Sequence, residues 1–270
     1  MLCSFLHYIC VFICKSYLVV RRELYRFGMP PKIGDERVII SLTSWSKRIN
    51  NVPIVIDSIL NNTIKPDKIV LNLSLEEFPN RENDLPQDIV NLQDCGTIEI
   101  GWQEGNTKAF KKIIPTLKKY PNDAIIAIDD DFYYPTDFIQ TFVDMHKKFP
   151  KNPLCGNRIE IKGVKAHCGC SSLVKAEYFG CYIDKLYSND IVKYRMDDVL
   201  YTYCAEMNRC HYLYVGKEFN MNMPQINPID GISDEYTDKY NTIMEEYLIK
   251  EIKSLFGINI KKLNEPIFSF

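Results

Sequence analysis

Short apolar runs rich in β-branched residues alternate with helical patterns through the first half of this chain. The runs at residues 37–43 (RVIISLT), 68–74 (KIVLNLS), 97–102 (TIEIGW) and 124–128 (AIIAI) are too short for buried helices, and we expect them to be strands. Strands that alternate with helices form a mostly parallel sheet with helices on both faces. The sequence therefore predicts an α/β fold, in which ligands bind beyond the carboxyl ends of the strands.

The helices are predicted from apolar residues at helical spacing. Pro53 fits the first turn of one helix, a second covers residues 107–120, and a third begins after Pro135. The second half of the chain is less regular. There we expect short strands or loops over residues 161–179 and helices over residues 196–206 and 241–256.

The length of 270 residues favours one principal domain, because a chain of this size buries enough surface for a single core. We expect that domain over residues 35–270. An apolar segment at residues 1–28 precedes it, and the prolines at 30 and 31 indicate a linker between the two.

The charge balance argues against nucleic-acid binding. The sequence has 33 Lys and Arg residues and 35 Asp and Glu residues, so no overall positive field attracts nucleic acid. Ten cysteines occur, but no CxxC pair, and the spacing of a zinc site is absent. We expect reduced cysteines, which suit a cytoplasmic protein.

Residues 1–20 are strongly apolar but include His7 and Lys15. A secretory signal carries its positive charge before the apolar core, whereas here the arginines follow it. The polar residues form a narrow stripe, which favours a helix in the membrane interface over residues 1–22. A spanning helix and a helix packed on the domain are the alternatives. Either membrane arrangement leaves the main domain at the inner face of the cytoplasmic membrane.

Three consecutive aspartates follow the apolar run at residues 124–128. Adjacent carboxylates repel one another, and a divalent cation removes that conflict. If strand alternation continues through them, Asp129 and Asp131 project to one side while Asp130 points away. Two oxygen ligands on one side suit Mg²⁺ or Mn²⁺, with phosphate oxygens and water completing the shell. The alternative is a solvated acidic turn before the next helix.

Three segments carry a family resemblance: VIISLTSWSKRI, PDKIVLNLS and TKAFKKIIPTLKKYPNDAIIAIDDDFYYP. In this order they resemble bacterial glycosyltransferases of the GT-A fold, close to the family 2-like group that builds cell-surface polysaccharide and lipopolysaccharide. The resemblance extends over about residues 37–214. It implies a nucleotide-sugar donor, a divalent metal (Mn²⁺ or Mg²⁺), a glycan or lipid-linked acceptor and, usually, inversion at the anomeric carbon. The nucleotide-sugar half is then expected at residues 35–135 and the acceptor half at residues 136–270.

The resemblance also implies donor-side residues. Thr43 lies where such enzymes begin their nucleotide pocket, Arg48 is similar to the basic residue that faces the nucleotide or its phosphates, and Lys108 resembles a basic position before the aspartates. Lys112 is expected at the surface. The alternatives are that Thr43 is an ordinary strand-end residue and Arg48 a surface charge.

The three aspartates resemble the DxD motif of the family. Asp131 is then the residue nearest the metal, and Asp129 faces the ribose or a metal-bound water. Asp129 and Asp131 are the expected metal ligands, and Asp129 and Asp130 are expected in the nucleotide-sugar site.

On the acceptor side, the segment GCSSL from residue 169 takes the place of a glycine-rich loop, and the segment RMDDV resembles the family's acidic pair. A sugar hydroxyl becomes a good nucleophile when a carboxylate removes its proton, and a carboxylate at a helix start stays ionised. We expect Asp198 to be that base and Asp197 to bond an acceptor hydroxyl. The alternative is that both only stabilise the helix. His211 is expected to be a half-exposed strand residue rather than a third metal ligand.

Two other functions are compatible with strand-end aspartates. A metal-dependent nucleotidyltransferase is disfavoured because no GxxxxGK[ST] phosphate loop occurs. A non-catalytic nucleotide- or sugar-binding protein of the same fold is the second alternative. In such a protein, alanine at Asp129 and Asp131 would abolish nucleotide binding, whereas Asp198→Ala would change no measurable turnover.

Overall fold

The computed structural model describes residues 35–156, 158–161, 164–167, 171–187, 197–216, 223–226 and 238–259. The predicted N-terminal segment at residues 1–28 lies outside these ranges, as do Gly169 and Cys170 of the expected acceptor loop. No helix within the described ranges is both long enough and apolar enough to cross a bilayer.

The first half of the described chain alternates strands with helices as the sequence predicts. Its elements are β1 (Val38–Thr43), η1 (Ile49–Asn51), α2 (Val52–Leu60), β2 (Lys68–Ser74), η2 (Arg81–Asp84), α3 (Gln87–Asp94), β3 (Glu99–Gln103), η3 (Lys108–Lys112), α4 (Ile114–Lys119), β4 (Ala124–Ile128) and α5 (Phe138–Lys148).

The second half has shorter elements. They are β5 (Leu154–Cys155), β6 (Arg158–Ile161), β7 (Val164–His167), β8 (Ser171–Val174), α6 (Ala176–Phe179), α7 (Tyr182–Leu186), α9 (Asp197–Met207), β9 (Leu213–Tyr214) and α10 (Asp238–Phe256). The helices expected over residues 196–206 and 241–256 are thus present as α9 and α10 with slightly shifted ends.

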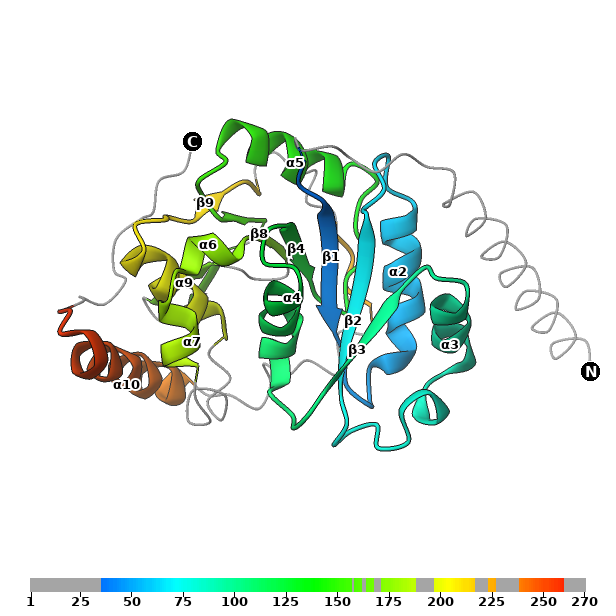
Figure 1. Cartoon of the computed structure of the whole chain (residues 1–270), viewed down its shortest axis with the longest axis horizontal. Helices are drawn as coiled ribbons and strands as arrows, with labels where there is room; N and C mark the ends of the chain where they lie inside the picture. Colours follow the sequence, from blue (N-terminus) through cyan, green and yellow to red (C-terminus); the bar gives the residue numbers. More distant parts are fainter. Residues whose placement is uncertain are drawn as a thin grey trace, which may run out of the picture.

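A seven-stranded sheet in the order β3-β2-β1-β4-β8-β5-β9 forms the centre of the fold (Figure 1). The pairs β2–β3, β1–β2 and β1–β4 are parallel, whereas β8 runs antiparallel to both β4 and β5. The sheet is therefore mostly parallel, and the carboxyl ends of β1, β2 and β4 meet at one edge. Strands β6 and β7 form a separate antiparallel pair.

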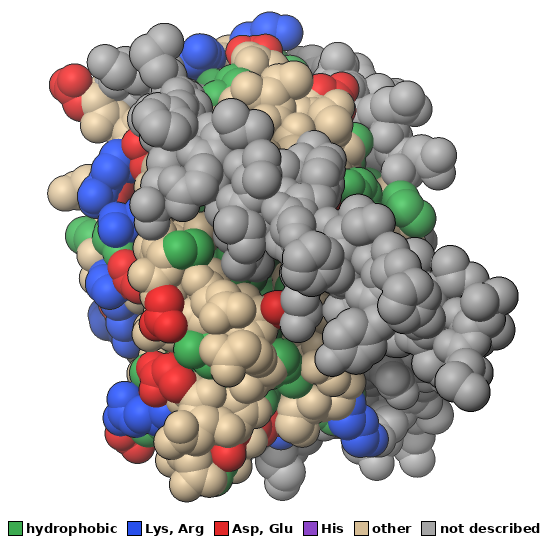
Figure 2. All heavy atoms as spheres, turned by 90° about the vertical axis from the view of Figure 1, so that its right-hand side faces the viewer, with side chains coloured by type: hydrophobic (Ala, Val, Ile, Leu, Met, Phe, Trp, Pro, Cys, Tyr) green, Lys and Arg blue, Asp and Glu red, His purple; other side chains and the backbone are tan. Residues whose placement is uncertain are grey.

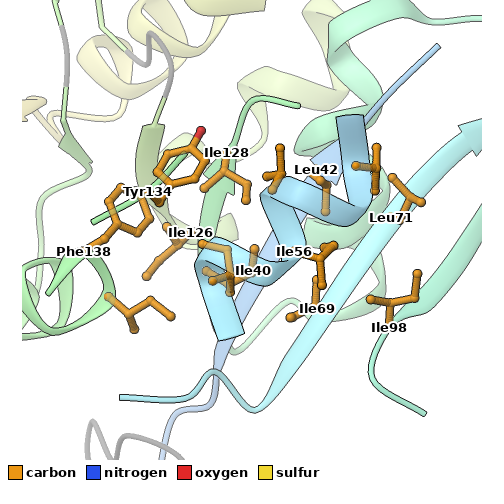
Figure 3. Packing of buried hydrophobic residues seen from close by; sticks show 14 of the residues in the cluster. Ile40, Leu42, Ile56, Ile69, Leu71, Ile98, Ile126, Ile128, Tyr134 and Phe138 are labelled. Carbon is orange, nitrogen blue, oxygen red and sulfur yellow. The ribbon is translucent and has the colours of Figure 1, made fainter. Parts of the chain in front are cut away.

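Helices cover both faces of this sheet, so the expected α/β layering is confirmed. Alternate residues of β1 point to opposite sides: Ile40 and Leu42 belong to a core cluster that includes residues of α2, α3 and α5, while Ile39 belongs to a second cluster that includes residues of α4, α9 and α10. Figure 3 shows Ile56 of α2 lying over the side chains of the central strands. All five residues of β4 are buried, because the strand is covered on both faces and paired on both edges.

The helix predicted over residues 107–120 is interrupted. A 3₁₀ segment, η3, ends at Lys112, and α4 starts at Ile114 with Pro115 in its first turn. Proline lacks the N–H that would continue the helical hydrogen bonds, and its ring clashes with the preceding turn. The break therefore changes which side chains of residues 108–112 face the sheet.

Figure 2 shows the face formed by the right-hand side of Figure 1. Basic and acidic side chains are interspersed over its coloured part, and hydrophobic side chains occur there singly. Both signs of charge are thus mixed on this part of the surface.

A buried polar network joins Glu36 to α5 and α6. His146 on α5 is buried, and its Nε2 and Nδ1 atoms lie 3.2 Å from Glu36 Oε2 and 3.3 Å from the Tyr178 hydroxyl. Lys175 Nζ donates to Glu36 Oε1 at 2.6 Å, and the Tyr178 hydroxyl donates to the Pro150 carbonyl. Burial lowers the pKa of His146 below its ordinary value of 6.5.

This network predicts a pH-dependent loss of stability. Below pH 6.5 the unfolded chain takes up a proton at His146 more readily than the folded chain, so the free energy of unfolding falls as the pH drops through 6.5. Urea unfolding at pH 7.5 and 5.5 should show a larger loss for the wild type than for His146→Gln. Equal losses in the two proteins would contradict this prediction.

Candidate active site

The polar residues after β1 lie at the carboxyl edge of the sheet. The Thr43 hydroxyl donates to the Asn72 carbonyl of β2 at 2.7 Å, so this side chain ties two strand ends together. The next residue, Ser44, is buried and donates to Asp130 Oδ2 at 2.5 Å. The end of β1 is therefore directly connected to the aspartates that follow β4.

Arg48 forms ion pairs with two of these aspartates. Its Nη2 lies 2.5 Å from Asp130 Oδ1 and its Nη1 lies 2.7 Å from Asp131 Oδ2. All three side chains are nearly excluded from solvent, with exposed fractions of 11%, 3% and 9%. Arg48 is thus a buried ion-pair partner of the acidic cluster and not a surface charge.

The aspartates do not alternate as expected. Asp130 and Asp131 share Arg48, whereas Asp129 pairs with Lys112, so the expectation that Asp129 and Asp131 project together away from Asp130 is wrong. The physical reason is that β4 ends at Ile128. The alternation of side chains along a strand does not extend into the turn that follows.

A segment from late in the chain completes the surroundings of Asp131. Gln225 Nε2 donates to Asp131 Oδ2 at 3.0 Å, and the Ile226 N–H donates to the Asp131 carbonyl at 2.6 Å. Gln225 also forms a β-bridge with Phe132. The backbone on both sides of Gln225 is therefore held against the acidic turn.

Asp129 pairs with the lysine that the sequence analysis placed at the surface. Lys112 Nζ donates to Asp129 Oδ1 at 2.8 Å, and the lysine side chain is only 7% exposed. The Asp129 N–H donates to the Tyr134 hydroxyl at 2.9 Å. The surface expectation for Lys112 is wrong, because the 3₁₀ segment turns this side chain towards the sheet edge.

Lys108 lies at the start of η3 with a positive φ of 54°. Its N–H donates to Asn106 Oδ1 at 3.1 Å. Within the described ranges no ion pair joins Lys108 to the aspartates. Its charge instead acts on Lys111, whose pKa is lowered to about 8 mainly by burial and in part by Lys108.

The structure brings Asp197 and Asp198, at the start of α9, to the same cluster. Burial lowers the pKa of Lys112, but the charges of Asp129 and of the two α9 aspartates outweigh it and raise that pKa well above its ordinary value. Burial also raises the pKa of both α9 aspartates, and for Asp198 the charge of Asp197 adds to this rise. A helix start was expected to keep these two carboxylates ionised. Burial instead dominates and raises their pKa, which favours the protonated forms.

Asp198 Oδ1 is buried and has no hydrogen-bond partner among the residues that the structure describes. A buried carboxylate oxygen without a partner is costly unless something occupies that position. Its raised pKa makes Asp198 a stronger base than an ordinary aspartate.

The cluster has more negative than positive groups. The five aspartates lie around two basic side chains of the described chain, Arg48 and Lys112, which leaves an excess of three negative charges when every group is ionised. Burial raises the pKa of Asp130 to about 7, although Arg48 and Ser44 lower it. A cation that binds here would relieve the repulsion.

The donor set fits a hard divalent cation that also binds phosphate. Among the described residues no three His, Cys, Asp or Glu side chains are close enough to enclose a metal ion by themselves. Two carboxylates with phosphate oxygens and water suffice for Mg²⁺ or Mn²⁺. His211 pairs with Glu206 at 2.7 Å on the surface, just before β9.

Ser44, Lys112 and Gln225 are the members of this cluster that the sequence analysis did not find. Ser44 follows a predicted strand end, which is the one local signal that could have indicated it. Gln225 carries no such signal, because its contact with Asp131 joins positions 94 residues apart.

The mostly parallel sheet with this acidic strand end is the GT-A-like α/β fold that the sequence predicts, and comparison with solved structures confirms it. TarS from S. aureus matches with a TM-score of 0.52 and 8% identity, over 84% of this chain and 41% of TarS. The TarS fragment 1–349 in complex with UDP-GlcNAc matches with a TM-score of 0.50 and 10% identity, over 84% of this chain and 68% of the fragment.

The mannosyltransferase PcManGT from Pyrobaculum calidifontis, in complex with GDP-Man and Mn²⁺, matches with a TM-score of 0.48 and 14% identity. That match covers 74% of this chain and 64% of the mannosyltransferase, so the chain spans less than two thirds of its length. No protein-family model and no curated protein matches the sequence. The likeness to TarS therefore establishes the fold.

Proposed function

We propose that this chain is a metal-dependent glycosyltransferase that moves a sugar from a nucleotide-sugar donor to a hydroxyl of a glycan or lipid-linked acceptor. The observation that supports it best is the meeting of two acidic groups at one sheet edge. The aspartates after β4 and the pair that begins α9 both interact with Lys112. A transferase needs this arrangement, because one set of carboxylates must hold the cation at the leaving group and the other must accept the proton of the attacking hydroxyl.

On the donor side, Asp129 and Asp131 would hold Mn²⁺ or Mg²⁺. Burial raises the pKa of Asp131 and the charge of Asp129 adds to this rise, so the two carboxylates are close together although they pair with different basic side chains. The cation would neutralise the charge that develops on a diphosphate leaving group. Arg48 keeps Asp130 and Asp131 in place. Thr43 and Lys108, both at the carboxyl edge, are the remaining proposed contacts of the nucleotide. The TarS fragment was crystallised with UDP-GlcNAc, so donors of this class are the first to test.

On the acceptor side, Asp198 would accept the proton of the attacking hydroxyl while Asp197 bonds a neighbouring hydroxyl. The acceptor oxygen forms a bond to the anomeric carbon as the bond from that carbon to the diphosphate oxygen breaks. The electron pair of the broken bond leaves with the nucleoside diphosphate. Attack opposite the leaving group inverts the anomeric carbon.

We place this activity in cell-surface polysaccharide synthesis at the inner face of the cytoplasmic membrane. The apolar N-terminal segment and the segments that resemble surface-glycan enzymes support this setting.

Thermal unfolding with UDP, GDP, CMP or dTDP, each with and without Mn²⁺, tests the donor site. A ligand that binds only the folded chain stabilises it by about 2.7 kcal/mol at a hundredfold excess over its Kd. We expect one nucleoside diphosphate to raise the Tm in the presence of Mn²⁺, and we expect Asp131→Asn to abolish that shift.

Asp137→Asn is the matched control, because Asp137 is an exposed aspartate that caps α5 without a side-chain hydrogen bond. It should keep the full shift. Folded protein whose Tm responds to no nucleotide would count against the donor site. A shift with nucleoside triphosphates alone would favour a nucleotidyltransferase.

A further inference from the structure

Lys112 is the buried cation between the two acidic groups of the site. Its ammonium donates to Asp129 at 2.8 Å, and the charges of both α9 aspartates act on it. Asp129 is 30% exposed, whereas Lys112 is 7% exposed. The lysine therefore lies beneath the carboxylate, on the side away from solvent.

The backbone of Lys112 is held as firmly as its side chain. The Ser41 hydroxyl of β1 donates to the Lys112 carbonyl at 2.6 Å, and the same hydroxyl lies 2.6 Å from the hydroxyl of Thr116. Asn72 of β2 donates to Thr116 at 2.9 Å. Three elements, β1, β2 and α4, thus fix the position from which the ammonium extends.

Burial alone does not distinguish this lysine. The adjacent Lys111 is equally buried, but its Nζ donates to the neutral Asn106 at 2.7 Å. A buried ammonium is costly, and an apolar side chain of similar size would be cheaper if only packing mattered. The placement of Lys112 among carboxylates points to a role in the site.

We propose that Lys112 is a positioning residue for the transfer reaction, whose ammonium holds the cation-binding Asp129 and the acceptor-side aspartates of α9 at one place. This inference rests on the proposed function. The geometry has a second consequence. Because Lys112 and a divalent cation interact with the same carboxylate, the lysine weakens binding of the cation when no nucleotide is present.

Lys112→Met in the full-length protein tests both the positioning role of the lysine and its effect on cation binding. Removal of a positive charge beside Asp129 should tighten Mn²⁺ binding without nucleotide by about tenfold, measured by calorimetry. Loss of the shared counter-charge should lower kcat by about 100-fold, measured as UDP release from UDP-GlcNAc, with a smaller change in KM. A general folding defect cannot tighten Mn²⁺ binding while it slows turnover.

Three further variants complete the test. Lys112→Arg keeps the charge and should stay within about threefold of wild type in both measurements. Lys112→Gln lacks the charge but keeps a donor, and it should tighten Mn²⁺ binding as Lys112→Met does. Lys111→Met, the matched control, should change neither quantity.

Wild-type Mn²⁺ affinity and turnover in Lys112→Met, or the same losses in Lys111→Met, would overturn the inference and leave the proposed function standing. A wild-type protein that binds neither Mn²⁺ nor a nucleotide sugar would overturn both.

Discussion

Replacement of Asp198 with asparagine is expected to lower kcat by about three orders of magnitude, while the donor still binds. Asparagine has nearly the same size but cannot accept the proton of the attacking hydroxyl. Burial and the charge of Asp197 raise the pKa of Asp198, so its carboxylate binds a proton more tightly than an ordinary aspartate does. Donor binding should persist because Asp129 and Asp131 are unchanged.

The measurement is the rate of UDP release from UDP-GlcNAc with water as acceptor, together with the nucleotide-induced rise in Tm. Asp184→Asn is the control, because Asp184 lies on α7 with 69% of its side chain exposed. Wild-type turnover in the Asp198→Asn protein would contradict the assignment of Asp198 as the base. Nucleotide binding without turnover in the wild type would favour the non-catalytic protein.

The second large effect is expected on stability. Arg48→Met should lower the free energy of unfolding by about 3 to 5 kcal/mol, because it leaves Asp130 and Asp131 buried without their partner. Arg48 lowers the pKa of Asp130, so the variant binds a proton there more tightly than wild type does. Its stability relative to wild type should therefore fall further as the pH rises from 6 to 8.

Urea unfolding of Arg48→Met, Asp130→Asn and the double variant measures this coupling. With the Asp130 charge already removed, Arg48→Met should cost clearly less than it does in the wild type. Equal costs in the two backgrounds would show that Asp130 does not contribute to the effect. The pH series distinguishes the loss of charge pairing from the loss of packing.

The sequence was sufficient for the layers of the fold because its strong signals are local. The run at 124–128 has no polar residue, and all five of its residues are buried in β4. The same local reasoning failed at residues 107–120, where Pro115 interrupts the helix. Helical periodicity counts apolar residues, and it does not register a missing N–H.

Prediction of the site likewise succeeded where the signal was local and failed where it depended on distant residues. The three aspartates were found from the end of a predicted strand and Arg48 from the family resemblance, and the structure pairs Arg48 with Asp130 and Asp131. Lys112 was missed because a lysine beside an apolar helix face normally points to solvent. Its burial follows from the carboxylates opposite it, which come from distant elements, and one sequence does not reveal such pairings.

The pairing of Gln225 with Phe132 has a consequence for the order of events during synthesis. The ribosome adds the 94 residues from Phe132 to Gln225 in roughly 5 to 20 s. During that interval Asp131 is part of the chain but lacks the amide of Gln225 and the N–H of Ile226. The hydrogen bonds of the acidic turn are therefore completed only after the later part of the polypeptide has been made.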